Sequence, residues 1–413
     1  MPVMRIPYTD PLPAPRILPP SASTVRGTIA ALTNFLVTPA RTSVPTQQTP
    51  SPPHPSAAES NHATSALASS RPRTLLLTGA GISVASGLAD YRGSSGTYTL
   101  NKTYRPIYFS EFVGSHASRQ RYWARSFLGW ENLRRAKPNT SHRAVAALGQ
   151  AGALQSVITQ NVDSFHKILD DPASLPTLEL HGYLRATVCL TCRKEYDRQA
   201  FQERLCELNP AWHTFLQECL RSGALDTENP IERRERGLKT NPDGDVDLPG
   251  VDYATFRYPA CPSCLGKDAR VDVDQDGAVV PTTKAGVLKP AVVMFGESIP
   301  PEVKTRAEEF VDAADKMLIV GSSLATYSAW RLAKKATDQG KPVGILNMGG
   351  VRGEEGFFEG VPRDNDGSLA FRSQEASEFI LPEVVERVQK MWGTSSDKVA
   401  DKTLDDAKAS ASS

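Results

Sequence analysis

The sequence predicts an α/β fold, a doubly wound parallel sheet with a small inserted domain. Short apolar segments alternate with helix-like segments between residues 73 and 347, the pattern of parallel strands with helices on both faces. Two Cys-x-x-Cys pairs interrupt that alternation. Of the 413 residues, 40% are hydrophobic, which is enough for a buried core and about two or three folded units.

The elements before the insertion are helices and two strands. The first helix has its apolar side chains at helical spacing, and the first strand runs directly into a Gly-x-Gly turn. The long helical stretch that follows is rich in aromatic residues. In chain order these elements are Val25–Val37, Arg73–Thr78, residues 110–135, Ser141–Gly149 and Leu154–Thr159.

The insertion holds the cysteines, a helix-like run at Gln199–Leu220 and a polar, acidic stretch. After it, strand and helix alternate again, and a last helix closes the fold. The predicted elements are Ala291–Phe295, Glu302–Ala314, Met317–Val320, Tyr327–Gln339, Pro342–Asn347 and Pro382–Met391.

The charge is almost balanced, with 47 Lys and Arg against 46 Asp and Glu, a net charge of +1. This balance excludes a strongly basic surface for direct nucleic-acid binding. We also expect no membrane span, because no segment approaches the roughly 20 apolar residues that a bilayer requires.

The six cysteines separate into four paired and two unpaired residues. Two Cys-x-x-Cys turns can supply the four thiolates of a tetrahedral structural zinc site. Two disulfides, or one redox-active pair, are the alternatives, but a secreted disulfide framework would need an export signal and a small domain. We therefore predict zinc at Cys189, Cys192, Cys261 and Cys264, and expect Cys206 and Cys219 to be buried apolar thiols.

The turn after the first strand is a candidate nucleotide-binding loop. Gly79-Ala80-Gly81 would let the backbone approach a pyrophosphate at the start of the next helix. The full dinucleotide fingerprint is incomplete, because Val84 stands where Gly or Ala is expected and the acidic residue comes early, at Asp90. The loop therefore disfavours a hydride-transferring dehydrogenase, and a plain strand-to-helix turn remains the alternative.

Polar residues follow the other strands as well. Gln160-Asn161-Val162-Asp163 comes after the second strand, where ligands of doubly wound sheets bind, although Asp163 could equally cap a helix. His181, before Gly182, has the pKa range of a general base, although a lone histidine is more often structural. Gly321-Ser322-Ser323 and Asn347 follow later strands and suit phosphate or ribose.

Taken in order, these motifs resemble those of the sirtuin family. The resemblance covers about residues 73–349, and the run Arg119–Arg125 looks like the class II branch, which contains a mitochondrial lipoamidase and ADP-ribosyltransferase. The motifs that carry it are Gly79–Ser83, Ser86–Arg92, Gln160–Asp163, His181-Gly182, the two cysteine pairs, Phe295-Gly296-Glu297, Gly321–Leu324 and Asn347.

The resemblance implies a Rossmann-type NAD-binding catalytic domain with an inserted zinc-binding domain. The catalytic domain would be 26–182 and 282–392, and the zinc-binding domain 183–281. Composition alone predicts the disordered or targeting segment (1–25), the flexible insertion (38–72) and the disordered tail (393–413), which are Pro-, Ser- and Thr-rich or polar. The resemblance implies catalytic roles for His181, Asn161 and Asp163, with His181 as the base. It implies NAD contacts at Gly79, Ala80, Gly81, Ser83, Asp90, Tyr91, Arg92, Gln160, Asn161, Val162, Asp163, Gly321, Ser322, Ser323, Asn347, Met348, Gly349 and Ala376. Val293, Phe295 and Gly296 resemble the strand that pairs with the substrate peptide.

The implied activity is NAD-dependent removal of an acyl group from protein lysine, with transfer to ADP-ribose and release of nicotinamide. Two departures from the family's usual motifs, Ala89 and Ala291, leave the rate and the acyl preference open. Tyr122 and Arg125 could form a pair for acidic acyl groups, although core packing is the simpler interpretation.

The alternatives are a mono-ADP-ribosyltransferase or lipoamidase on the same scaffold, and a weakly catalytic module that binds NAD and zinc. The expected partners are acylated lysine side chains of proteins, and the expected state is a monomer. Residues 1–72 contain five Arg and only two acidic residues, Asp10 and Glu59, which resembles a mitochondrial transit region. We expect a mitochondrial matrix location, with cytoplasm or nucleus as the alternative.

Overall fold

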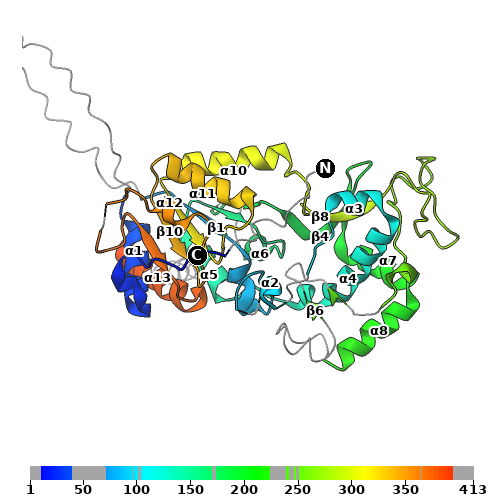
Figure 1. Cartoon of the computed structure of the whole chain (residues 1–413), viewed down its shortest axis with the longest axis horizontal. Helices are drawn as coiled ribbons and strands as arrows, with labels where there is room; N and C mark the ends of the chain where they lie inside the picture. Colours follow the sequence, from blue (N-terminus) through cyan, green and yellow to red (C-terminus); the bar gives the residue numbers. More distant parts are fainter. Residues whose placement is uncertain are drawn as a thin grey trace, which may run out of the picture.

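A computed structural model describes residues 11–39, 71–94, 96–100, 104–169, 174–223, 239–240, 246–247, 251–362 and 364–393. Most of the predicted insertion 38–72 and all of the tail 394–413 lie outside these residues. Figure 1 shows the parallel sheet with its helices at one end of the molecule and the cysteine-bearing module toward the other. No helix in the described part of the chain is both long and apolar enough to cross a bilayer.

The main sheet is a six-stranded, fully parallel sheet. Its spatial order, in which the chain runs outward from the centre on one side and then returns to the other, is that of a doubly wound Rossmann-type fold. The strands in that order are β11 (Phe371–Ser373), β10 (Val343–Leu346), β9 (Lys316–Val320), β1 (Thr74–Thr78), β2 (Ser156–Thr159) and β3 (Thr177–Glu179). The direction in which successive strands are added to the sheet reverses between β1 and β9, and doubly wound sheets bind ligands at such a switch point.

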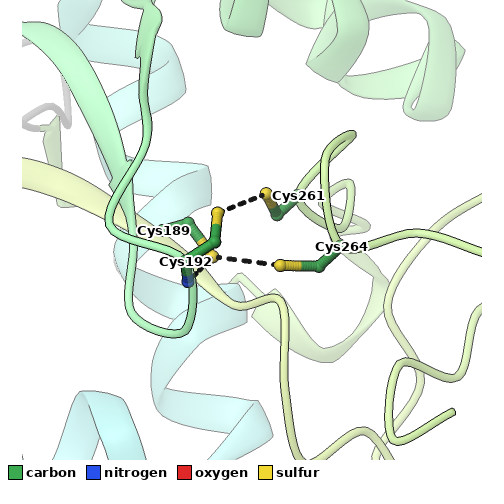
Figure 2. A group of neighbouring side chains, drawn as sticks. All are labelled: Cys189, Cys192, Cys261 and Cys264. Atoms are coloured by element: carbon green, nitrogen blue, oxygen red, sulfur yellow. Dashed lines mark hydrogen bonds between the residues drawn. The ribbon is translucent and has the colours of Figure 1, made fainter. Parts of the chain in front are cut away.

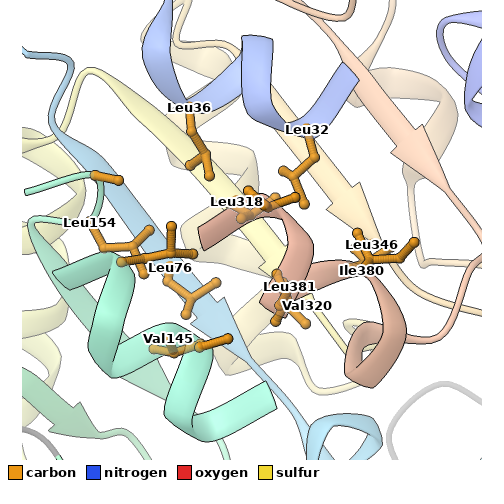
Figure 3. Packing of buried hydrophobic residues seen from close by; sticks show 14 of the residues in the cluster. Leu32, Leu36, Leu76, Val145, Leu154, Leu318, Val320, Leu346, Ile380 and Leu381 are labelled. Carbon is orange, nitrogen blue, oxygen red and sulfur yellow. The ribbon is translucent and has the colours of Figure 1, made fainter. Parts of the chain in front are cut away.

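Alternating side chains of the central strands pack on opposite faces of this sheet. Leu76 and Leu318 enter a core with α1 (Val25–Val37), α5 (Thr140–Gln150) and α13 (Ser377–Trp392), which Figure 3 shows. Leu75, Leu77 and Ile319 point to the other face, against α10 (Pro301–Ala313), α11 (Tyr327–Asp338) and α12 (Glu354–Phe357). The sequence prediction of helices on both faces is confirmed.

The module has its own antiparallel sheet and its own core. The sheet consists of β5 (Glu195–Asp197), β4 (Gly182–Cys189) and β8 (Leu288–Val292). Its core joins Cys189 and Cys261 with aromatic side chains of α4 (His116–Arg135), so residues before the insertion pack on it. The remaining elements around it are α3 (Phe109–Gly114), α7 (Arg198–Leu208), α8 (Pro210–Arg221), η3 (Tyr253–Thr255), β6 (Lys239–Thr240) and β7 (Val246–Asp247).

The run Arg119-Gln120, used above as a sign of the class II branch, has a structural role. The Arg119 guanidinium donates to the Tyr258 hydroxyl at 2.7 Å and to the carbonyls of Phe112 and Val113. The Gln120 amide donates to two carbonyls of the segment that leads to the second cysteine pair. Both side chains are buried, so they fasten α4 to the module.

Two predicted helices are interrupted. Within residues 110–135 the chain breaks at Ser115, whose hydroxyl accepts a hydrogen bond from the Ser118 N–H and starts α4. The run Gln199–Leu220 is split at Asn209, because Pro210 lacks the N–H that would continue α7. The last helix starts at Ser377, five residues before Pro382, which lies inside it.

The strand predicted at Ala291–Phe295 is wrong in position and in sheet. The observed strand, β8, ends at Val292 and pairs antiparallel with β4. A turn follows it, in which the Glu297 N–H donates to the Met294 carbonyl at 2.9 Å and Gly296 has a φ of 80°. The short strands β3, β5 and β11 and the central strand of the module sheet, β4, were not predicted.

Residues 18–24, which fall within the segment expected to be disordered or a targeting signal, are instead part of the fold. Leu18 exchanges two backbone hydrogen bonds with Arg372 of β11, at 3.0 and 2.7 Å. The short helix η1 (Pro20–Ser23) follows, and Ala22 is buried in the core. Residues 1–10 of that segment lie outside the described residues.

Candidate active site

One large cleft, with a volume of about 1740 Å³, lies where β1 and β9 end. All predicted cofactor-binding and catalytic residues line it. Its walls come from both halves of the molecule, because the segment after β8 lines it together with the loops of the parallel sheet. The roles of these residues remain predictions, but the sheet topology brings them to one place.

The loops after β1 and β9 touch each other through their backbones. The Gly81 N–H donates to the Gly321 carbonyl at 2.9 Å. A Cβ added to Gly79 or to Gly81 would lie 2.8 Å from that same oxygen, closer than van der Waals contact permits. The two glycines therefore leave room for close packing of the two loops, and the following segment, η2 (Ala80–Ser86), is a 3-10 helix. Glycines at this turn also let a pyrophosphate approach the backbone closely.

Ser83, Asn161 and Asp163 form a hydrogen-bonded cluster on the cleft wall. The Ser83 hydroxyl donates to Asp163 Oδ2 at 2.7 Å and accepts from Asn161 Nδ2 at 3.1 Å. The Phe165 N–H donates to Asp163 Oδ1 at 3.0 Å, at the start of α6 (Phe165–Leu169), so Asp163 satisfies the first N–H of this helix from one position before the N-cap. Burial raises the pKa of Asp163, while these hydrogen bonds oppose that rise.

Gln160 joins the loops rather than pointing freely into the cleft. Its amide nitrogen donates to Ser322 Oγ at 2.7 Å and to the Thr78 carbonyl at 3.1 Å. Its side-chain oxygen accepts from the Thr326 hydroxyl at 3.1 Å. The side chain thereby fixes the spacing of the β1, β2 and β9 ends.

His181 lies at the junction between β3 and β4, on the cleft. Its Nδ1 is 3.2 Å from the Gln160 carbonyl, an acceptor, which places the proton on Nδ1. Nε2 is then free to accept a proton, and in this structure it is 2.8 Å from the Ser328 hydroxyl. Burial lowers the pKa of His181 to about 4, so the imidazole is neutral at pH 7, as a general base must be.

Ser328 is a cleft residue that sequence reasoning missed. It lies on α11, and its contact with His181 joins residues that are 147 positions apart. A serine near the start of a helix is ordinary, so the sequence held no signal for this contact. Tyr122 and Arg125 are both buried and both line the cleft, so core packing and contact with the cleft hold together for this pair.

The residues predicted for the mobile cofactor loop form a compact turn. The Gly93 N–H donates to Asp90 Oδ1 at 3.0 Å, and burial raises the pKa of Asp90. Tyr91 stacks on Tyr98 with ring centroids 5.8 Å apart, and the Arg92 guanidinium lies 5.0 Å from the Tyr98 ring. This turn lines the cleft together with the β1 loop.

At the opposite end, the predicted adenosine contacts follow β9 and β10. The Asn347 amide donates to the Gly349 carbonyl at 2.9 Å, and Met348 is 69% exposed beside it. Ala376 precedes the first turn of α13 and also lines the cleft. These residues form the open rim of the cleft.

Two buried histidines lie behind the cleft. His142 Nε2 is 3.4 Å from Ser83 Oγ, and its Nδ1 accepts the Asn139 N–H in the capping box of α5. His166 Nε2 is 3.2 Å from the Thr78 hydroxyl. Burial lowers the pKa of His142 to about 2 and that of His166 to about 4, so both are neutral at pH 7.

The four paired cysteines form one cluster, shown in Figure 2. Their sulfurs all lie within 4.8 Å of one another, and the closest pairs across the two knuckles are Cys192–Cys261 at 3.6 Å and Cys189–Cys264 at 3.8 Å. These separations are far longer than the ~2.05 Å of a disulfide. They match tetrahedral zinc, for which Zn–S bonds of about 2.3 Å place the sulfurs about 3.8 Å apart.

The cluster lies outside the cleft lining, and its four thiols leave no coordination position for water. A metal held there would be structural. Cys206 and Cys219 are not in the cluster; Cys219 is buried in the module core and Cys206 is half-buried beside it.

The comparisons with known proteins agree with this geometry. A model described as "Sir2 family" matches residues 79–328. An NAD-dependent protein deacylase of Batrachochytrium dendrobatidis is 41% identical over 286 residues, which span 68% of this chain and 83% of that protein. An NAD-dependent protein deacylase of Arabidopsis thaliana is 36% identical (68% of each chain), and an NAD-dependent protein deacetylase of Bordetella bronchiseptica is 36% identical (72% of this chain, 92% of that one). The chain belongs to the Sir2 family.

Proposed function

We propose that this protein is an NAD-dependent protein-lysine deacylase. The observation that carries the proposal is the position of His181. Its imidazole lies in the same cleft as both glycine loops, and its carbonyl accepts the Val293 N–H at 2.7 Å from the other wall. A base is thus held where a nucleotide on the sheet side and a peptide on the module side would meet.

The residues of the cleft suit this chemistry. When bound, NAD supplies a ribose carbon from which nicotinamide can leave. The glycine loops would hold its phosphates, and Asn347 and Ser322 lie on the rim predicted for adenosine. The Asp163 carboxylate, oriented by Ser83, is placed to favour developing positive charge on the sugar. His181 Nε2 would accept a proton from a ribose hydroxyl, and the Gln160 carbonyl would stabilise the proton on Nδ1.

The segment after β8 is the proposed peptide-binding edge. Val293–Gly296 follows the end of β8 at Val292 and is only partly engaged through its backbone, because the Val293 N–H donates to the His181 carbonyl at 2.7 Å and the Phe295 carbonyl accepts from the Phe109 N–H at 2.9 Å. Two contacts hold the segment in place. The buried Lys289 ammonium donates to the Val292 carbonyl at 2.6 Å, and Glu297 accepts the Met294 N–H at 2.9 Å. An extended acyl-lysine peptide can pair with such an edge.

The test is a panel of lysine peptides carrying acetyl, long-chain, acidic and lipoyl groups, with nicotinamide release as the readout. Mass spectrometry of the products identifies the reaction. Acylated ADP-ribose together with free lysine supports the proposal, and activity that is best with the lipoyl peptide identifies a lipoamidase. ADP-ribose attached to a protein would instead identify a mono-ADP-ribosyltransferase. No turnover with any acyl group would leave only a binding module.

We also propose a mitochondrial location and a monomeric state. The location is supported by residues 1–17, which contain Arg5 and Arg16 and one acidic residue, Asp10. The packing of Leu18 on β11 requires that a removable leader end before it. Imaging of a C-terminally tagged chain, with N-terminal sequencing of the mature form, tests the location, and light scattering tests the monomer. A cytoplasmic or nuclear signal would overturn the first proposal, and a dimer mass the second.

A further inference from the structure

Residues 12–18, here called the strap, run past the rim of the cleft before the first helix begins. Leu12 lines the cleft itself. We propose that the strap completes the adenosine end of the NAD site by holding residues 347–350 in place, an inference that rests on the proposed function above.

The first argument is direct contact. A Cβ added to Gly350 would clash with the Pro13 carbonyl oxygen and lie 3.0 Å from Leu12 Cβ. The strap backbone therefore lies directly on Gly350, which follows Asn347, Met348 and Gly349 in the same loop. A glycine at this position leaves the space that the strap occupies.

The second argument is a shared buried ion pair. The Arg372 guanidinium and the Glu354 carboxylate are 2.8 Å apart, and both side chains are almost fully buried. Arg372 also donates to the carbonyls of Asn347 and Gly349, each at 2.7 Å. This one side chain therefore fixes the backbone of the loop at two points.

The strap is attached to the same two residues. The Arg16 N–H donates to Glu354 Oε1 at 3.2 Å, and Leu18 exchanges backbone hydrogen bonds with Arg372. The strap and the loop of residues 347–350 are therefore both hydrogen-bonded to the Arg372–Glu354 pair, in addition to their direct contact at Gly350. Because coupling between two binding events is reciprocal, a strap that favours nucleotide binding must itself be stabilised by the nucleotide.

Removing one partner of a buried ion pair leaves an unpaired charge and threatens the fold. The better variant is Gly350→Ala, which displaces the strap and leaves Arg372 and Glu354 intact. Its matched control is Gly356→Ala in α12, where an added Cβ meets no atom within 4 Å. We expect Gly350→Ala to weaken ADP-ribose binding, measured by calorimetry, about 5- to 10-fold. The KM for the acylated peptide and the zinc content should stay unchanged. Equal Kd values for the two variants would overturn the proposal.

A second measurement uses the unaltered chain, and it decides the question if Gly350→Ala does not fold. Arg16 is exposed, so trypsin can cleave after it. Saturating ADP-ribose should slow that cleavage about fivefold or more, with trypsin activity on an unrelated peptide as the control. An unchanged rate in a chain that binds ADP-ribose would refute the strap proposal alone. Failure of the wild-type chain to bind ADP-ribose would instead contradict the proposed function.

Discussion

The parallel-sheet half and the cysteine module are held together by different means. In the sheet half, apolar strands are buried on both faces, and the polar groups of the cleft are fixed by hydrogen bonds such as Gln160 to Ser322. In the module, short strands and long connections converge on four thiols and one aromatic core. The proposed catalytic residues follow strands of the parallel sheet, whereas the thiol cluster lies in the module, so we expect changes in the two halves to have separable effects.

The largest effect should come from His181→Ala. Removal of the base should lower turnover by about 10²- to 10⁴-fold, because proton transfer from the ribose hydroxyl would lose its acceptor. Nicotinamide release with an acylated peptide measures the rate, and metal analysis should still find bound zinc. Ser328→Ala is the comparison variant: it frees Nε2 and leaves His181 in place, so its effect should be much smaller. Full activity of His181→Ala would reject the assignment of the base.

Cys261→Ser should destabilise the cysteine module. With three thiols left, we expect loss of tightly bound zinc and a fall of more than about 10 °C in the unfolding temperature, because metal-binding energy contributes to folding. Zinc analysis and calorimetry measure the two effects. Cys206→Ser is the matched control, because Cys206 lies outside the cluster. Zinc retained by Cys261→Ser at full occupancy would contradict a four-thiolate site.

Asp163→Asn should reduce the rate of turnover, with a smaller effect on zinc content and folding than Cys261→Ser has. The amide oxygen can still accept from the Phe165 N–H, but the amide nitrogen cannot accept from the Ser83 hydroxyl, and the negative charge beside the reacting sugar is removed. We expect kcat to fall about 10- to 100-fold. Steady-state kinetics with the acylated peptide, together with the Kd for ADP-ribose, separate chemistry from binding. A variant that lost affinity while keeping kcat would place Asp163 in binding alone.

The smallest predicted effect is a pH dependence of the sheet half. Burial depresses the pKa of His142 and His166 to about 2 and about 4, so both are neutral in the folded state. Between pH ~6.5 and ~4 the unfolded chain binds protons that the folded chain does not. Stability is therefore complete above about pH 6.5 and decreases as the pH falls, by up to about 1.4 kcal/mol per pH unit for each histidine.

Denaturant unfolding at pH 7 and pH 5, with zinc in excess, tests this dependence. His166→Asn should show a smaller loss of stability between the two pH values than the wild type. A difference equal to that of the wild type would show that His166 does not contribute. The module should respond to chelator and the sheet half to acid, if the two halves differ as proposed.

Much of the sheet half could be predicted because its signals are local. Leu75, Leu76 and Leu77 form an apolar run that must be buried on both faces. The loop motifs of the cleft follow their strands directly in the sequence, so they could be located once the strands were predicted. The module was harder to predict. Its strands are short and partly polar, and the turn at Met294–Glu297 ends β8 three residues earlier than the apolar pattern indicated.

The sequence by itself determined the parallel fold, the four cysteines of the cluster and part of the cleft lining, because apolar periodicity and ligand spacing are local patterns. The tertiary structure alone decided how those residues are held. Three contacts join positions from 25 to more than 300 residues apart: Ser328 with His181, Arg372 with the Asn347 carbonyl, and the strap with Gly350. Such contacts depend on packing between distant elements, for which no residue has a local signature.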